Sequence, residues 1–131
     1  MARLAVVVLV AFVFATTSAK SEPGEFKHVK AGKPIYKDFA YVAVPEVNAL
    51  SKIDKLLVPT EVLFVKRQRV ENGANYQIFV MFGDTECPKF KYLQTPKKCK
   101  ALEGNSSPVE LILYRSRAGD VTVKEVIPVP E

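Results

Sequence analysis

The chain contains little of the chemistry that enzymes and metal sites need. Its 131 residues include one histidine, two cysteines, two methionines and no tryptophan. Catalysis needs a poised set of groups, and His28, on an arm that we expect to be extended, is the only histidine available as a general base. Two thiols with no histidine nearby fall short of the four ligands of a structural zinc site. We therefore expect no enzyme activity, no metal site and no cofactor.

A strong excess of one charge is also missing. The chain has 19 Lys and Arg residues against 14 Asp and Glu residues, a formal net charge of +5 at pH 7. The basic residues are spread along the sequence and mixed with acidic ones, and no nucleic-acid-binding motif accompanies them. This pattern favours a solvated surface over a nucleic-acid interface.

The one long apolar run lies at the amino terminus. Arg3 stands before an apolar run from Leu4 to Ala15, and Thr16 to Ala19 follow. This is the layout of a secretory signal peptide, and the run is shorter than the roughly 20 residues that a membrane-spanning helix needs. We expect cleavage after Ala19, so that residues 1–19 are removed and residues 20–131 form a single secreted domain with no membrane span.

The two cysteines favour one disulfide bond. Cys87 and Cys99 are an even pair in a chain bound for an oxidising compartment. The bond would clip a long segment from Gly83 to Pro108, which its prolines and glycine predict to be irregular. It would also leave no free thiol for a Cys–His nucleophile.

An arm and then a helix are predicted for the first part of the mature chain. The arm runs from Lys20 to Lys33, with a short edge strand around Phe26 to Lys30, and Pro34 suits the first turn of a helix. From Ile35 to Leu50, apolar residues recur in steps of three and four and predict one buried helical face. That face comprises Ile35, Phe39, Val42, Ala43, Val47 and Leu50. Pro45 lies inside the run, so we expect a kink or an early break.

A hairpin is predicted after the polar connector Ser51 to Asp54. Glu61 to Val70 and Asn75 to Phe82 are rich in β-branched and aromatic residues, and in the second run Tyr76, Ile78 and Val80 alternate with Gln77, Phe79 and Met81. Glu71-Asn72-Gly73 lies between the two runs. Asn-Gly favours a tight hairpin turn there, because both residues tolerate positive φ.

A second hairpin follows the clipped segment. Val109 to Tyr114 and Val121 to Ile127 have the composition of strands, and Ser116 to Gly119 supply the turn. The chain therefore has an arm, one helix and four strands arranged as two hairpins. Runs of antiparallel strands after a single helix indicate an α+β fold, with the helix packed on one face of the sheet.

Several motifs occur in a fixed order along this framework. Pro23-Gly24 is followed, after nine residues, by Pro34 at the start of the helix, whose last turns contain Ala43-Val44, Glu46 and Asn48. Gln68 to Gly73 leads into Ala74-Asn75-Tyr76, and the cysteine pair follows. Together these motifs resemble those of the secreted cystatins, inhibitors of papain-like cysteine proteases, including their Q-x-V-x-G hairpin, the G-x-N-Y that leaves it and the first of their two disulfide loops. The resemblance covers nearly all of the mature chain.

The resemblance implies a cystatin-like fold, one long helix packed on a four- to five-stranded antiparallel sheet. It also implies reversible inhibition of papain-like proteases such as cathepsins, by a monomer acting in the extracellular space. In the family's mechanism an amino-terminal arm and two hairpin tips enter the protease cleft as a wedge. The corresponding residues here are Gly24, then Gln68, Arg69, Val70, Glu71, Asn72 and Gly73, and finally Arg117 and Ala118.

The sequence departs from the family pattern at three places. The segment Gln68 to Gly73 is one residue longer, which changes the turn type or introduces a bulge. Arg117-Ala118 stands where the family usually has Pro-Trp, and Val109 stands where the second disulfide would begin. Buried aromatic residues are common binding hot spots, so the lack of the Trp should weaken binding to a protease. An alternative function is therefore a non-inhibitory cystatin scaffold. It would bind another extracellular protein, in immune modulation, defence or venom.

Two further surface features follow from the sequence. Asn105-Ser106-Ser107 is a possible glycosylation site in a predicted surface loop, although the proline that follows disfavours modification. The connector Ser51 to Asp54 has no asparagine of the kind through which some secreted cystatins inhibit legumain, so we do not expect that activity.

Overall fold

Five antiparallel strands and three short α-helices make up the described part of the chain. The structure, a computed structural model, describes residues 24–129, and the expected signal peptide lies outside them. The elements are β1 (Lys27–Val29), α2 (Pro34–Val42), α3 (Val44–Leu50), β2 (Lys55–Val70), β3 (Gly73–Pro88), α4 (Lys89–Tyr92), a 3-10 turn (Pro96–Lys98), β4 (Ala101–Ser116) and β5 (Val121–Pro128). None of the helices within residues 24–129 has the length and apolar character needed to cross a membrane.

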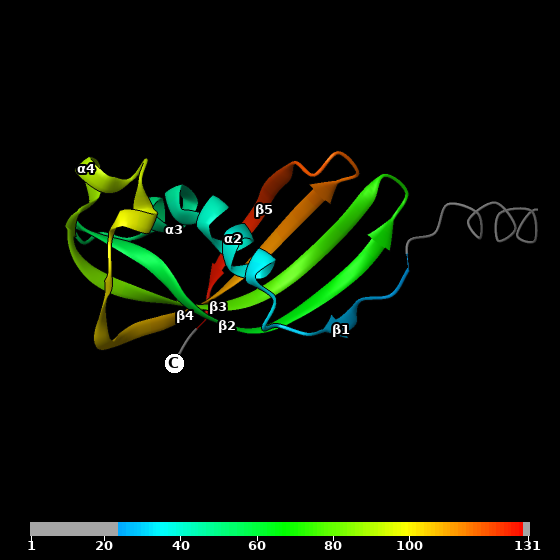
Figure 1. The fold of residues 1–131 in the computed structure, drawn as a ribbon, viewed down its shortest axis with the longest axis horizontal. Helices are drawn as coiled ribbons and strands as arrows, with labels where there is room; N and C mark the ends of the chain where they lie inside the picture. Colours follow the sequence, from blue (N-terminus) through cyan, green and yellow to red (C-terminus); the bar gives the residue numbers. More distant parts are fainter. Residues whose placement is uncertain (1–23, 130–131) are drawn as a thin grey trace, which may run out of the picture.

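The strands form one sheet in the order β1-β2-β3-β4-β5, and every neighbouring pair is antiparallel. Helices α2 and α3 lie along one side of this sheet, whose long middle strands curve across the whole molecule (Figure 1). The predicted α+β class and cystatin-like arrangement are thus confirmed. The sheet has five strands, within the predicted four to five, and β1 is the edge strand predicted around Phe26 to Lys30.

The helical segment is broken where the proline predicts a break. Helix α2 ends at Val42 and α3 begins at Val44, with Ala43 between them at φ −86° and ψ 0°. Pro45 lacks an N–H and disfavours helical geometry in the residue before it. The Ala43 N–H instead donates to the Ala40 carbonyl at 3.1 Å, which tightens the turn. The expected single helix is therefore two helices joined by a kink.

The buried face of these helices differs in part from the predicted one. Phe39, Ala43 and Val47 are buried as expected, but Ile35, Val42 and Leu50 are 37%, 44% and 56% exposed. The face that packs on the sheet consists of Tyr36, Phe39, Ala40, Ala43, Val44 and Val47. Tyr36 contributes an aromatic ring that contacts Phe39 and Tyr76.

The strands are much longer than the sequence predicts, and the irregular segment is shorter. The prediction of irregular structure from Gly83 to Pro108 is wrong at both ends, because β3 continues to Pro88 and β4 begins at Ala101. Residues 89–100 lie outside the strands, and residues 102–105 of β4 bulge out between the pairs Gly83–Ser106 and Thr85–Ala101. Gly83 pairs with Val58 and with Ser106, so backbone hydrogen bonding continues across residues that have little strand propensity.

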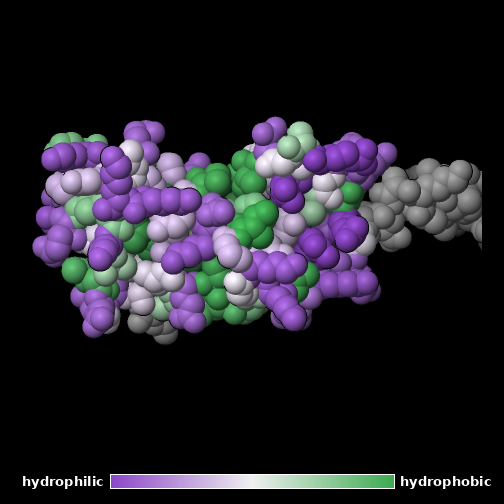
Figure 2. All heavy atoms as spheres, viewed as in Figure 1, coloured by the Kyte–Doolittle hydropathy of each residue, from purple (hydrophilic) through white to green (hydrophobic). Residues whose placement is uncertain are grey.

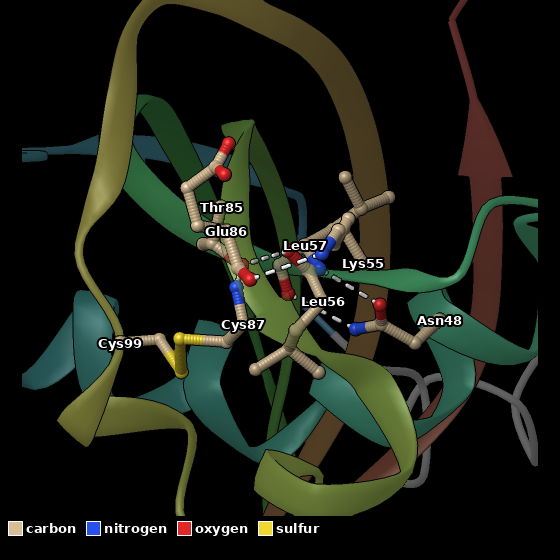
Figure 3. The surroundings of a disulfide bond; sticks show 8 residues. All are labelled: Asn48, Lys55, Leu56, Leu57, Thr85, Glu86, Cys87 and Cys99. Atoms are coloured by element: carbon tan, nitrogen blue, oxygen red, sulfur yellow. Dashed lines mark hydrogen bonds between the residues drawn. A yellow bond between two sulfur atoms is a disulfide. The ribbon is translucent and has the colours of Figure 1, made fainter.

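The predicted disulfide between Cys87 and Cys99 is present and closes this shortened segment. Figure 3 shows it beside the buried start of β2, where polar groups are paired. The Thr85 hydroxyl, 1% exposed, donates to the Leu56 carbonyl at 2.8 Å and accepts from the Cys87 N–H at 3.1 Å. The cysteine pair is thereby held against the ladder by a hydrogen-bonded neighbour.

Asn48 joins the helical layer to the sheet. Its side chain is 2% exposed and donates to the Val44 carbonyl at 2.9 Å. It also donates to the Leu57 carbonyl at 3.0 Å and accepts from the Leu57 N–H at 2.8 Å (Figure 3). A buried amide with these three partners mimics a strand pairing to β2. It therefore fixes the end of α3 against the first residues of the long hairpin.

Replacing Asn48 with alanine should destabilise the protein by about 1–3 kcal/mol, because the N–H and carbonyl of Leu57 would lose their partner in a buried setting. Urea unfolding measures this change. The control is Asn105→Ala, at an exposed position in β4, which should shift stability by less than about 0.5 kcal/mol. Equal effects of the two substitutions would contradict this role of Asn48.

Candidate functional site

The amino-terminal arm and both hairpin tips meet at one end of the sheet. The Gly24 N–H donates to the Arg69 carbonyl at 3.0 Å, and the Arg117 N–H donates to the Asn72 carbonyl at 2.8 Å. In Figure 1 the β2–β3 tip and the β4–β5 tip lie beside each other at the end where the chain enters. Three segments that are far apart in the sequence thus form one edge, which we call the tip edge.

The turn of the first hairpin is placed one residue earlier than predicted. Val70 pairs with Gly73, so Glu71 and Asn72 form a two-residue loop. The prediction of positive φ at Asn72 and Gly73 is wrong, since among the described residues only Gly104 and Gly119 have positive φ. The reason is that Gly73 already belongs to the ladder, where it also pairs with Ser116.

Gly73 is needed for close packing rather than for an unusual φ. A Cβ built at this position would overlap the carbonyl oxygen of Arg115 and lie 3.0 Å from the Tyr114 hydroxyl. Glycine without a Cβ lets the two backbones approach. The strand that leaves the first hairpin can therefore lie tightly against the strand that enters the second.

The carbonyl of Asn72 links the two hairpins. It accepts hydrogen bonds from the Arg117 N–H at 2.8 Å and from the Tyr114 hydroxyl at 2.9 Å. The Arg117 guanidinium lies a further 3.5 Å from the Glu71 carbonyl. Sequence reasoning assigned no role to Tyr114, and only its position at the end of a predicted strand, next to the second turn, could have suggested one.

The second hairpin turns through Ser116 to Asp120, which confirms the predicted turn. The Gly119 N–H donates to the Ser116 carbonyl at 2.9 Å, and the Ser116 N–H donates to the Asp120 carbonyl at 2.9 Å. Gly119 has φ +103°, a conformation that favours glycine. Arg117 and Ala118 are exposed at the tip.

The remaining expected residues of the first hairpin are held in the ladder. The Asn75 side-chain amide donates to the Gln68 side-chain oxygen at 2.9 Å, directly across the strands. Val70 is partly buried and Arg69 is exposed. These contacts make Gln68 a support for the hairpin, while Arg69, Val70 and Glu71 line its accessible side.

A basic hollow adjoins the tip edge. Its volume is about 290 Å³, and its lining includes Arg67, Arg69 and Arg117 with Val70 and Glu71. Gly73, Ala74 and Tyr76 complete the lining. Sequence reasoning missed Arg67, although its two-residue spacing from Arg69 on a predicted strand places both on the same face.

The hydroxyl of Tyr36, in α2 near this hollow, has a raised pKa. Burial raises the pKa of the Tyr36 hydroxyl, the neighbouring Tyr76 raises that pKa further, and the Arg67 guanidinium lowers it. Arg67 pairs with Tyr76 across the ladder, and the Tyr76 ring centre is 5.9 Å from that of Tyr36, so Arg67 lies on the helix-facing side of the sheet.

Other candidate residues lie apart from the tip edge. Asn105 is exposed, but it lies within β4 and not in a loop, so that part of its prediction is wrong. His28 pairs with Lys66 in the ladder, its ring 5.8 Å from that of Phe64. Within residues 24–129 no three His, Cys, Asp or Glu side chains are grouped to hold a metal ion.

Comparison with protein families gives a match to the Cystatin domain over residues 24–111. The match includes the arm from Gly24, both helices of the kinked pair, the first hairpin, the whole disulfide-closed segment and β4 as far as Leu111. No curated protein sequence matches the chain significantly.

Solved structures with a similar fold include two tick proteins. A salivary cystatin from the soft tick Ornithodoros moubata is 14% identical, with a TM-score of 0.69 over 82% of this chain and 98% of that one. Mialostatin, a gut cystatin from the hard tick Ixodes ricinus, is 18% identical, with a TM-score of 0.68 over 82% of this chain and 100% of that one. Dimeric human cystatin F is 19% identical, with a TM-score of 0.63 over 80% and 86%. At these identities the likeness establishes the fold.

Replacing Gly73 with alanine should destabilise the protein by about 1–3 kcal/mol, because the added methyl group forces the backbone of β3 away from Arg115. Thermal or urea unfolding measures the loss. Gly32→Ala is the matched control, since a Cβ there meets nothing within 4 Å. A Gly73→Ala protein as stable as this control would show that the close approach of the hairpins is not required.

Proposed function

Because the chain belongs to the cystatin family, as its match over residues 24–111 shows, we propose that it is a reversible inhibitor of papain-like cysteine proteases such as cathepsins, and not an enzyme. The observation that carries this proposal is the meeting of the Gly24 arm with both hairpin tips at a single edge. The expected binding residues are Gly24, Gln68 to Gly73, Arg117 and Ala118.

The tip edge is suited to binding because its parts are already linked. The Asn72 carbonyl holds the second hairpin, and the Arg69 carbonyl holds Gly24 at 3.0 Å. A rigid edge loses little conformational entropy when it enters a cleft, so more of the contact energy appears as affinity. Val70 supplies an apolar side chain beside the turn, and Gly24 leaves room for close backbone contact.

The same hydrogen bonds explain how the tip could block a protease without being cut. A cysteine protease attacks a carbonyl carbon whose oxygen enters an oxyanion hole. The Asn72 carbonyl oxygen at the tip already accepts two hydrogen bonds from the second hairpin, and the Glu71 carbonyl faces Arg117. Presenting either bond for attack would require these contacts to break, so the expected inhibition is competitive and reversible.

Secretion as a single domain completes the proposal. The amino-terminal sequence has the layout of a signal peptide ending at Ala19, and two structural relatives are named as salivary and gut cystatins of ticks. We propose that residues 20–131 act as a single extracellular domain.

A second candidate function is supported by the chemistry of the second tip. Arg117 and Ala118 are its exposed residues, and neither offers the buried aromatic anchor common at tight interfaces. On this alternative the chain is a non-inhibitory scaffold that binds another extracellular protein. Deleting Asn72 distinguishes the two functions. Under the main proposal the deletion should weaken inhibition, because the link between the hairpins is lost. Inhibition that appears only after the deletion would support the alternative.

Titration of the mature protein into papain and cathepsin L should give complete competitive inhibition. Val70→Ala should raise the inhibition constant roughly tenfold, because two methyl groups leave the contact, a loss of about 1.6 kcal/mol. Leu63→Ala removes an exposed side chain from the same strand, seven positions before Val70 in the printed sequence, and should leave the constant unchanged. If both proteases keep full activity at micromolar protein, the proposal is wrong for these enzymes and the scaffold alternative gains support.

A further inference from the structure

Three arginines converge on the hollow beside the tip edge. Arg67 and Arg69 enter it from β2, and Arg117 enters it from the second hairpin. A second hollow of about 340 Å³ shares Arg67 and Arg69 and adds Lys27, Gly24 and Glu25. Figure 2 shows hydrophilic residues gathered over the end of the molecule where Figure 1 places the two hairpin tips.

These guanidinium groups lack a carboxylate partner in the described part of the chain. The one ion pair within residues 24–129 joins Lys97 to Asp38 at 3.3 Å. Arg115, on the neighbouring strand, is used differently, because its guanidinium lies 5.9 Å from the ring centre of Phe39 and packs against α2. Within this part of the chain Arg67 and Arg69 have no carboxylate partner, and Arg117 makes only the 3.5 Å contact with the Glu71 carbonyl, so all three can still bind a carboxylate from outside the chain.

The walls of the hollow suit a planar anionic group. Each guanidinium offers a fork of N–H donors that matches a carboxylate in a bidentate way. The small Ala74 side chain is part of the lining, and the partly buried Arg67 lies directly across the ladder from Tyr76. Because Arg67 and Arg69 stand two residues apart on one strand, their charges act on the same side of the sheet.

Two acidic residues limit which anions fit. Glu71 lines the first hollow and Glu25 lines the second, so neither basic cluster is free of negative charge. A sulfated sugar chain, whose charges are more closely spaced, would be repelled by both glutamates, whereas single carboxylates of a peptide can approach the arginines between them.

We propose that the arginine hollow formed by Arg67, Arg69 and Arg117 receives carboxylate side chains of the protein that the tip edge binds. The partner then has Asp or Glu residues on the rim beside the cleft that accepts Val70 and Gly73. This inference rests on the proposed function, because it names the surface chemistry of the partner at the same edge. The arginines select among proteases by their rim charge and speed association at low salt.

The experiment uses a blocked hexaglutamate peptide as the probe. NMR spectra of the mature, isotopically labelled protein follow the arginine Nε–H resonances during titration with this peptide, with a blocked hexaglutamine peptide as the uncharged control. We expect the resonances of Arg67, Arg69 and Arg117 to shift with hexaglutamate alone, and the shifts to diminish as sodium chloride is added. Unchanged arginine resonances, or equal shifts with both peptides, would overturn the proposal.

Charge-matched variants separate the hollow from the overall positive charge. The triple variant Arg67→Gln, Arg69→Gln, Arg117→Gln should lose at least about tenfold in affinity for hexaglutamate. The control triple variant Lys52→Gln, Lys98→Gln, Lys100→Gln removes the same charge from exposed positions outside the hollow and should bind as the parent does. Equal losses in both variants would show attraction by net charge only.

A heparin hexasaccharide tests the excluded ligand class. If it shifts the three arginines and hexaglutamate does not, the hollow binds sulfated sugars and the proposal is wrong. The peptide titration needs no protease, so its failure is distinct from a failure to inhibit papain or cathepsin L. Where a protease is inhibited, the triple arginine variant should slow its association more at low salt than at high salt.

Discussion

The register of the long β2–β3 hairpin is the constraint on which the rest of the structure depends. Lys55 pairs with Pro88 at one end and Val70 pairs with Gly73 at the other. A shift of one residue would turn every buried side chain of β3, from Tyr76 to Phe82, toward solvent. The same register brings Cys87 beside the start of β2 and places the tip next to Ser116. The disulfide end and the tip edge are therefore positioned by one ladder.

Sequence reasoning predicted the elements that depend on local patterns and missed those that depend on pairing. Alternation in β3 and the break near Pro45 follow from single segments, and both are confirmed. The extension of β3 to Pro88 comes from hydrogen bonds to β2 and β4, which no local propensity encodes. Tyr36 replaces Ile35 in the core for a similar reason, since its ring packs against Tyr76 of a distant strand.

The candidate site was predicted in its components and not in its internal geometry. Gly24, the first hairpin and Arg117 were expected at one edge from the family resemblance, and the structure brings them together. The local preference of Asn-Gly for positive φ gave the wrong turn, because pairing of Gly73 with both neighbouring strands outweighs it. Arg67 and Tyr114 were missed because their importance comes from neighbours across the sheet.

The Asn72 carbonyl explains how the longer first hairpin stays ordered. An extra residue in a tight turn would normally loosen it, and ordering that loop on binding would cost affinity. Here the carbonyl accepts two hydrogen bonds from the second hairpin, so the added residue is held before any partner arrives. The same bonds bring Arg117 next to the hollow that Arg67 and Arg69 line. Like charges held close together repel one another in the free protein, and a carboxylate from a partner would relieve that repulsion on binding. The hydrogen bonds to the longer hairpin thus both fix the tip edge and keep Arg117 beside Arg67 and Arg69.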